Sequence, residues 1–134
     1  MKKFVLFSIF IMISCKSVDS NLSGNYKTHK SSYTEKWMNY FTNKCNILGV
    51  ELSLSQDSTF TIKTCSYNGN GKWTTKNDSL VLNYINQKIY TESTKSYKNV
   101  ENASELHERF LIKNNCFIQK IKTENDECIV KLTK

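Results

Sequence analysis

Apolar residues recur at every second position in short runs in the middle of this chain. Val50, Leu52 and Leu54 alternate with polar residues, and Phe60 and Ile62 resume the alternation after a Gln-Asp-Ser sequence. Successive side chains of a β-strand point to opposite faces, so each run places its apolar residues on one face. The intervening polar residues favour a turn. This stretch therefore predicts a β-hairpin with one buried face.

The rest of the chain repeats this unit, with turn residues about every 8–12 positions. We expect further strands at residues 22–26, 72–75, 80–84, 85–92, 109–113, 116–122 and 128–132. Residues 68–71 predict a loop, Asn86 a turn, and Asn114-Asn115 a tight two-residue turn. Between residues 93 and 108 we expect little regular structure beyond one helical turn capped by Asn102. About eight short strands predict a mainly β protein, a single antiparallel up-and-down barrel or a sandwich.

One aromatic stretch has a period of three to four residues instead of two. Its members are Tyr33, Trp37, Tyr40 and Phe41. This spacing predicts a short helix near residues 33–43, packed over one end or edge of the sheet. If the four rings belong to the core, they are buried; if they are functional, they line a barrel mouth or form an exposed patch for a partner. Together with Trp73, which is expected to face inward, they are the candidate ligand-binding residues.

The N-terminus is typical of an export signal. Lys2 and Lys3 are followed by ten uncharged residues, Phe4 to Ile13. A helix of ten residues rises only about 15 Å, about half of the hydrocarbon core of a bilayer. We therefore expect residues 1–14 to be a cleaved signal peptide and not a membrane-spanning helix, which leaves 134 − 14 = 120 residues in one domain.

Residues 11–15, Ile-Met-Ile-Ser-Cys, resemble the lipobox of bacterial lipoproteins. The resemblance implies that Cys15 becomes the mature N-terminus and that its thiol carries the lipid anchor. Residues 15–21 would then be the lipidated cysteine and a polar tether, and residues 22–134 the β domain. The alternatives are an ordinary secretory signal, in which Cys15 has no special role, and a buried apolar helix.

Four cysteines remain besides Cys15, namely Cys45, Cys65, Cys116 and Cys128. An even number in an exported chain favours disulfides, because the compartment is oxidising. They are separated by 19, 50 and 11 residues, without the close pairs typical of a four-thiolate metal site. We favour the pairs Cys45–Cys65 and Cys116–Cys128, since each would join neighbouring strands or their flanks. Free thiols are the alternative.

Several strand and turn motifs resemble those of the small lipocalin-like domains of bacterial lipoproteins. They are Gly24-Asn25-Tyr26, the two strands from Val50 to Ile62, Gly71-Lys72-Trp73 and the aspartate-led strand from Asp78 to Leu82. The resemblance extends from Leu22 to Tyr84 and, more loosely, over residues 109–115. It implies an antiparallel β-barrel. Tyr26 stands where lipocalins proper carry tryptophan.

The charge of the chain is basic but diffuse. The formal net charge is +7, and Arg109 is the only arginine among the 19 basic residues. Nucleic-acid recognition favours the planar fork of arginine over lysine. Because the lysines are also scattered, we interpret the charge as a solvated surface and expect no nucleic-acid partner.

No catalytic or metal-binding motif is present in the sequence. His29 and His107 have no second ligand at metal-binding spacing, and we expect the polar group of His107 with Glu101, Glu105 and Glu108 to lack the burial that a general acid/base pair needs. A nucleophile elbow and a glycine-rich phosphate loop are also missing. We therefore predict neither an enzyme nor a cofactor nor a metal site.

These observations lead to a functional hypothesis. We expect a lipid-anchored, non-enzymatic lipoprotein of the bacterial cell envelope, attached to the outer membrane. Its barrel would bind a small hydrophobic ligand or a protein partner. The alternative is a protein-interaction module, such as an inhibitor of an envelope enzyme or an assembly factor. The charge disfavours an inhibitor of basic lysozymes. After loss of Lys2 and Lys3 the domain would carry a net charge of +5 and would be repelled by a basic enzyme.

Overall fold

The computed structural model describes residues 22–29, 32–41, 44–122, 124 and 127–134. Its elements are β1 (Gly24–Thr28), α1 (Tyr33–Phe41), β2 (Lys44–Asn46), β3 (Glu51–Leu54), β4 (Thr59–Lys63), β5 (Tyr67–Lys76), β6 (Ser79–Thr91), β7 (Ser96–Asn99), the 3-10 helix η2 (Ala103–Glu105), β8 (His107–Lys113), β9 (Cys116–Lys122) and β10 (Glu127–Thr133). The predicted signal peptide, Cys15 and the whole predicted tether lie outside the described residues.

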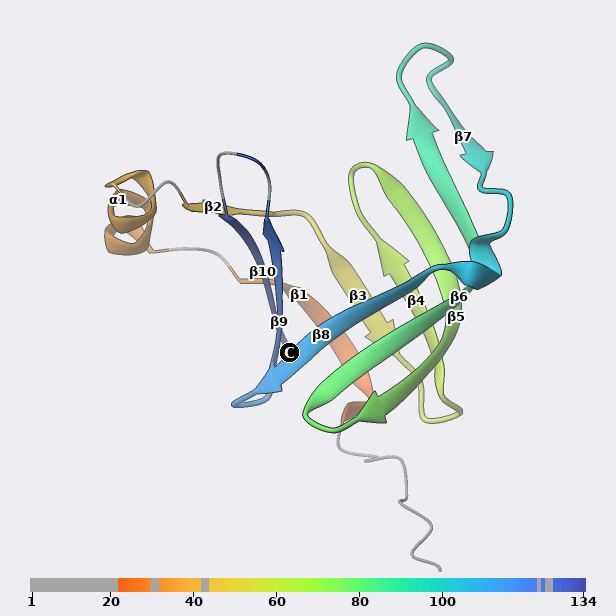
Figure 1. Cartoon of the computed structure of the whole chain (residues 1–134), viewed down its shortest axis with the longest axis horizontal. Helices are drawn as coiled ribbons and strands as arrows, with labels where there is room; N and C mark the ends of the chain where they lie inside the picture. The colour runs from red at the N-terminus through yellow and green to blue at the C-terminus, as the bar shows by residue number, and fades with distance from the viewer. Residues whose placement is uncertain (1–21, 30–31, 42–43, 123, 125–126) are drawn as a thin grey trace, which may run out of the picture.

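Eight of these strands form a closed antiparallel barrel, which resolves the choice between barrel and sandwich (Figure 1). The strands β1, β3, β4, β5, β6, β8, β9 and β10 pair in this order, so each neighbours the next barrel strand along the chain. The barrel closes where Lys27 and Thr28 of β1 pair with Thr133 and Leu132 of β10. Closure leaves the barrel no free edge strand.

Two strands lie outside this wall. β2 runs parallel to β10 and pairs with its first half, on the edge that β1 leaves unoccupied. β7 pairs with the last four residues of β6, and this two-stranded ribbon projects beyond the barrel (Figure 1). Non-local parallel pairing of a three-residue strand has no signature in the sequence, and β2 was not predicted.

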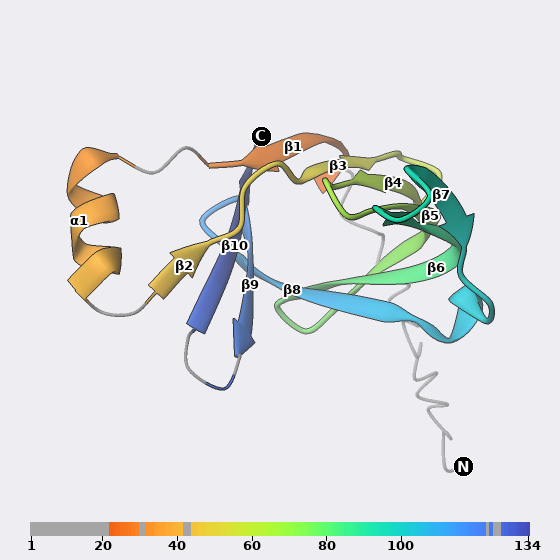
Figure 2. The ribbon, with the colours of Figure 1, turned by 90° about the horizontal axis from the view of Figure 1, so that it is seen from above.

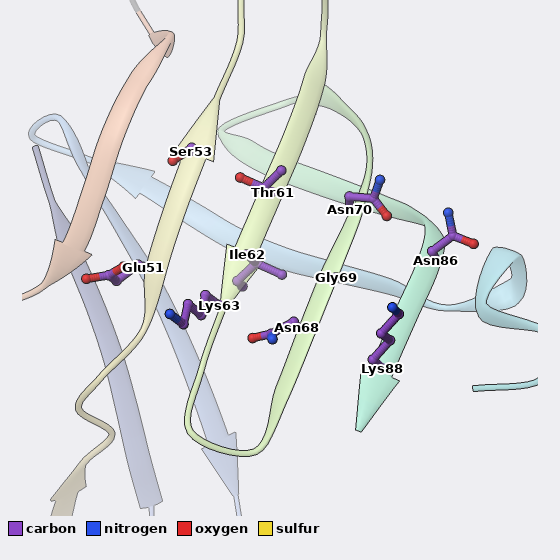
Figure 3. A pocket seen from close by; sticks show the side chains of 10 residues that line it. All are labelled: Glu51, Ser53, Thr61, Ile62, Lys63, Asn68, Gly69, Asn70, Asn86 and Lys88. Atoms are coloured by element: carbon purple, nitrogen blue, oxygen red, sulfur yellow. The ribbon is translucent and has the colours of Figure 1, made fainter. Parts of the chain in front are cut away.

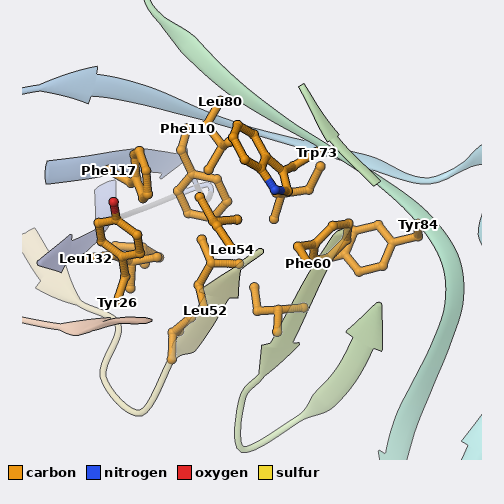
Figure 4. Close-up of a cluster of buried hydrophobic side chains, with 14 residues drawn as sticks. Tyr26, Leu52, Leu54, Phe60, Trp73, Leu80, Tyr84, Phe110, Phe117 and Leu132 are labelled. Atoms are coloured by element: carbon orange, nitrogen blue, oxygen red, sulfur yellow. The ribbon is translucent and has the colours of Figure 1, made fainter. Parts of the chain in front are cut away.

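The core fills the barrel at the end where the β5–β6 and β8–β9 turns lie. Its most buried large side chains are Trp73, Phe60, Phe110, Phe117, Leu52, Leu80, Leu82 and Leu132 (Figure 4). Trp73 is fully buried, and its indole N–H donates a 3.0 Å hydrogen bond to the carbonyl of Ser55. Tyr26 packs on Phe117 with ring centroids 4.4 Å apart and donates its hydroxyl to the carbonyl of Leu22 at 2.8 Å. We call this the closed end of the barrel.

Strand β5 passes straight through a segment that the sequence predicted to be a loop. The prediction for residues 68–71 is wrong because both glycines face inward and leave room for large neighbours. A Cβ atom on Gly69 would overlap the ring of Tyr84, and one on Gly71 would overlap the carbonyl oxygen of Asn83. The expected turn at Asn86 is also wrong. β6 continues through it with a bulge, because Ile85 has no partner in β5.

The helix forms near its predicted range and beside β2, an edge strand of the sheet, but its aromatic rings do not pack on the sheet. Ser32 caps it: the hydroxyl of Ser32 accepts the backbone N–H of Glu35 at 3.3 Å, and the Glu35 carboxylate accepts the N–H of Ser32 at 2.9 Å. The helix stands beside β2, to one side of the barrel, in both views (Figures 1 and 2). The interpretation of its rings as core is therefore wrong.

Asparagine turns match the predictions in part. Asn114 and Asn115 both have positive φ, 51° and 60°, as a tight hairpin between β8 and β9 requires. The helical turn expected after Asn102 exists as η2, but Asn102 is itself left-handed and makes no side-chain cap. The segment predicted to be irregular, residues 93–108, also contains β7.

Candidate functional site

A cavity of about 240 Å³ opens at the end of the barrel opposite the closed end. Its apolar wall consists of Ile47, Leu48, Val50, Ile121 and Val130, and its polar lining of residues 64–67, Glu108 and Gln119. The wall comes from the connection of β2 to β3 and from β9 and β10, whereas the polar groups come mainly from the β4–β5 turn and β8. We call this cavity the mouth.

Glu108 reaches the mouth because of the register of β8. Residues 108, 110 and 112 share one face of the strand, and Phe110 of this face is buried in the core. His107 and Arg109 belong to the opposite face and are exposed. The expectation that Glu108 belongs with His107 in an unburied polar group is therefore wrong, because Glu108 shares its face of β8 with the buried Phe110. The alternation around Phe110 was the signal that could have placed Glu108 inward.

Glu108 and Tyr67 are joined by a short hydrogen bond. The hydroxyl of Tyr67 donates to Oε1 of Glu108 at 2.7 Å. The other carboxylate oxygen, Oε2, is buried and has no hydrogen-bond partner among the described residues, and the same holds for the hydroxyl of Tyr84. Buried polar groups in proteins are nearly always paired, so two unpaired atoms in one polar cluster are unusual. The Tyr84 hydroxyl lies close enough to Glu108 and Tyr67 for hydrogen bonding to them to contribute to its raised pKa, so part of its hydrogen-bonding capacity is used within the cluster.

Burial and charge act together on the two tyrosines. Burial, followed by the negative charge of Glu108, raises the pKa of Tyr67 and of Tyr84 well above the ordinary value of 10.0. Both phenols are therefore protonated at neutral pH and can donate hydrogen bonds. A phenolate in this position would face both desolvation and repulsion from Glu108.

The β4–β5 turn holds Tyr67 in place. The Thr64 hydroxyl accepts the backbone N–H groups of Ser66 at 3.1 Å and Tyr67 at 2.8 Å, and donates to the Tyr67 carbonyl at 2.9 Å. The backbone N–H of Thr64 donates to the same carbonyl at 2.9 Å. This small network fixes the first residue of β5 at the rim of the mouth.

The five predicted ligand-binding residues do not meet at one site. Trp73 is part of the filled core at the closed end. The side chains of Tyr33, Trp37, Tyr40 and Phe41 project from α1 and are exposed to 82%, 61%, 80% and 74%. None of the five lines the mouth. The mouth was missed because its residues are spread over five segments of the chain.

The exposed rings form a second candidate surface, which we call the aromatic face of α1. Trp37 stacks on Phe41 with ring centroids 5.9 Å apart, and Tyr40 meets Phe41 edge to face at 5.7 Å. Lys36 places its ammonium group 5.9 Å from the ring centroid of Tyr33. A contiguous exposed aromatic surface of this kind is what the functional interpretation of the helix required.

The cysteines do not pair as we favoured. Cys65, on the exposed β4–β5 turn, and Cys116, beside the β8–β9 turn, are free thiols. Cys128 lies opposite Ile121 in the β9–β10 pair, five residues from Cys116, or about 17 Å along the strand. That distance rules out a Cys116–Cys128 bridge. Cys128 is disulfide-bonded, and its Cα partner in β2 is Cys45.

A third depression lies on the outer surface of the barrel. It has a volume of about 540 Å³ and spans β3 to β6 (Figure 3). Its lining is polar, with Ser53, Thr61, Asn70 and Asn86, and it is wide open to solvent. The mouth is the more enclosed and the more apolar of the two.

Other classes of site find little support in the described part of the chain. His29 and His107 are exposed, and the described residues contain no group of three or more potential metal ligands. Among the same residues, no helix is both long enough and apolar enough to cross a membrane. No family model, no curated protein and no solved structure matches this chain.

Proposed function

We propose that this chain is an exported, lipid-anchored protein of the bacterial envelope, without catalytic activity, whose barrel binds a small and largely apolar ligand in the mouth. The observation that carries the proposal is the mouth itself, a partly enclosed cavity with an apolar wall and two polar atoms without a hydrogen-bond partner among the described residues in the cluster beside it. Ligand sites commonly combine apolar walls with a few placed polar groups. The volume favours a small ligand, since it lies below the common range of about 300–1,000 Å³.

The position of the N-terminal segment supports an anchored orientation. The described chain begins at Leu22, at the closed end, where the Leu22 carbonyl accepts the hydroxyl of Tyr26 (Figure 1). An anchor at Cys15 would therefore attach the barrel by its closed end and leave the mouth facing away from the membrane. Radioactive palmitate should label the wild type and not the Cys15→Ala variant. Equal labelling of both would contradict the lipid anchor.

A disulfide between Cys45 and Cys128 fits the proposed export. The two Cα atoms are direct partners of adjacent strands, which are about 4.8 Å apart, within the range that a disulfide spans. Such a bond would fasten β2, and with it α1, to the barrel wall. Non-reducing peptide mapping should find the Cys45 and Cys128 peptides joined and both Cys65 and Cys116 accessible to alkylation after denaturation. Any bridge that includes Cys65 would contradict this pairing.

The ligand proposal is tested by filling the mouth. Gln119→Trp places a large ring in the cavity, whereas Lys120→Trp places the same ring on the outer face of the same strand. We expect a neutral hydrophobic dye to bind the wild type and the Lys120→Trp protein with similar affinity, and the Gln119→Trp protein at least tenfold more weakly. Equal binding by all three would locate the dye elsewhere and contradict a ligand site in the mouth.

The second candidate function is contact with a protein partner through the aromatic face of α1. The observation that favours it is the exposure of four contiguous rings beside the barrel. A Trp37→Ser, Tyr40→Ser double variant would remove two of these rings without touching the mouth. If the partner hypothesis is correct, this variant loses a stoichiometric envelope partner that the Gln119→Trp protein retains. If the double variant retains the partner, α1 is not the contact.

A further inference from the structure

We infer that the ligand of the mouth carries a primary ammonium group, which the carboxylate of Glu108 binds. This inference rests on the proposed function, because it assumes that the mouth is a ligand site. It adds the chemical class of the ligand: a small amine with a short apolar tail.

The first argument is the uncompensated charge of Glu108. The two ion pairs between described residues are Lys27–Glu51 and Lys120–Glu127, and both lie on the surface. Glu108 belongs to neither, and the basic residue next to it, Arg109, points to the opposite face of β8. The carboxylate thus lines a partly enclosed cavity, and no cationic side chain that the structure describes forms an ion pair with it. Removing a charge from water is costly unless a partner compensates it, and a bound cation would supply that partner.

The second argument is the arrangement of hydrogen-bond acceptors. An ammonium group has three donors and no acceptor. Glu108 and Gln119 both line the cavity, and one carboxylate oxygen of Glu108 has no hydrogen-bond partner among the described residues. The Tyr67 hydroxyl already donates to the other oxygen of Glu108 and so keeps the carboxylate oriented. A ligand carboxylate would meet the charge of Glu108 directly and be repelled.

The third argument is the division of the mouth into a charged and an apolar part. Ile47, Val50 and Val130 line the wall together, so an alkyl chain attached to the ammonium group would contact only carbon. The net charge of the chain, +7, would repel a cation at long range. This repulsion is screened within about 8 Å at physiological ionic strength. The preference of the mouth for a cationic ligand would therefore come from Glu108 and not from the net charge of the protein.

The test compares three probes of equal chain length: n-hexylammonium, n-hexanol and n-hexanoate. Binding to the full chain, purified in a neutral maltoside detergent, is measured by titration calorimetry at neutral pH. We expect n-hexylammonium to bind at least tenfold more tightly than n-hexanol, and n-hexanoate to bind most weakly. Glu108→Gln should reduce the affinity for n-hexylammonium to that for n-hexanol. Glu105→Gln, which removes the same charge from the exposed η2, should change nothing.

The possible failures are distinguishable. If n-hexanol binds as tightly as n-hexylammonium to the wild type, the ammonium inference is overturned while the ligand site in the mouth stands. If no probe binds to any protein, both the inference and the proposed function are contradicted. Should Glu108→Gln fail to fold, Tyr67→Phe provides a second variant, since it retains the charge of Glu108 and should retain the preference for n-hexylammonium. Loss of that preference would overturn the inference as well.

Discussion

The two ends of this barrel are built by the same strands with different inward residues. At the closed end, the inward positions of β5, β6 and β8 hold Trp73, Leu80 and Phe110, which fill the interior (Figure 4). Toward the mouth, the same strands place Tyr67 and Glu108 inward, next to the hydroxyl of Tyr84, whose ring belongs to the core. Two of these polar side chains have an unpaired buried atom. The contrast shows that the alternation of apolar and polar residues along the strands determines the barrel. A few polar residues at inward positions determine at which end a cavity remains.

The largest effect is expected at the closed end. Trp73→Ala removes the largest buried side chain and one of the two hydrogen bonds that the Ser55 carbonyl accepts, the other being donated by the Ser58 backbone N–H. Truncating a buried aromatic residue lowers the free energy of unfolding by about 3–5 kcal/mol. Urea denaturation followed by circular dichroism measures this loss. A loss below about 1 kcal/mol would mean that this end is not tightly packed.

A smaller loss of the free energy of unfolding is expected where β5 and β6 approach each other closely, between the two ends of the barrel. The added methyl group of Gly71→Ala would overlap the Asn83 carbonyl and lie 2.9 Å from the Phe60 ring. Overpacking a core costs about 1–3 kcal/mol, and we expect the upper part of this range because a backbone atom must move. The midpoint of urea unfolding reports the change. A variant as stable as the wild type would contradict the close approach of β5 and β6.

Alkaline pH separates the mouth from the closed end. Because the pKa values of Tyr67 and Tyr84 are raised in the folded protein, the unfolded chain loses these protons first as the pH passes 10. Their contribution to stability is therefore fully present below pH 10 and is lost as the pH rises above it. Tyr84→Phe should make the stability above pH 10 fall less steeply. An identical alkaline profile in the variant would show that Tyr84 is not buried beside a negative charge.

The smallest change in the free energy of unfolding is expected for substitutions in α1, outside the barrel. Trp37 is 61% exposed on α1, and its neighbours in the ring cluster are exposed as well. Trp37→Ala should change the free energy of unfolding by no more than about 0.5 kcal/mol, as is usual for surface positions. The same denaturation measurement used for Trp73→Ala gives a direct comparison of the two tryptophans. A loss above about 2 kcal/mol would place Trp37 in a packed core.

The sequence predicted the local features of this fold better than the long-range ones. The hairpin around Val50 to Ile62 and the turn at Asn114-Asn115 are written into neighbouring residues, and both form as predicted. The period of the aromatic residues predicted a helix, but a period gives the face of a helix and not what that face meets. Glycine was misleading at residue 69, where it makes room for Tyr84 inside a strand and forms no loop.

The mouth was harder to predict because it depends on closure. Val50, Glu108 and Gln119 are far apart in the chain, and only the completed barrel brings them to one cavity. The inward position of Glu108 could have been derived from Phe110, two residues away on the same face. The barrel itself closes only through the pairing of β1 with β10, which are at opposite ends of the described chain, and no local pattern in the sequence predicts that pairing.

Backbone amide shifts during titration with n-hexylammonium test the ligand site in the mouth most directly. If the ligand binds there, the largest shifts belong to residues around the mouth, such as Val50, Tyr67 and Gln119, while Leu80 and Phe117 of the closed end stay unchanged. Shifts concentrated on Trp37 and its neighbours in α1, or spread evenly over the outer surface, would contradict a ligand site inside this barrel.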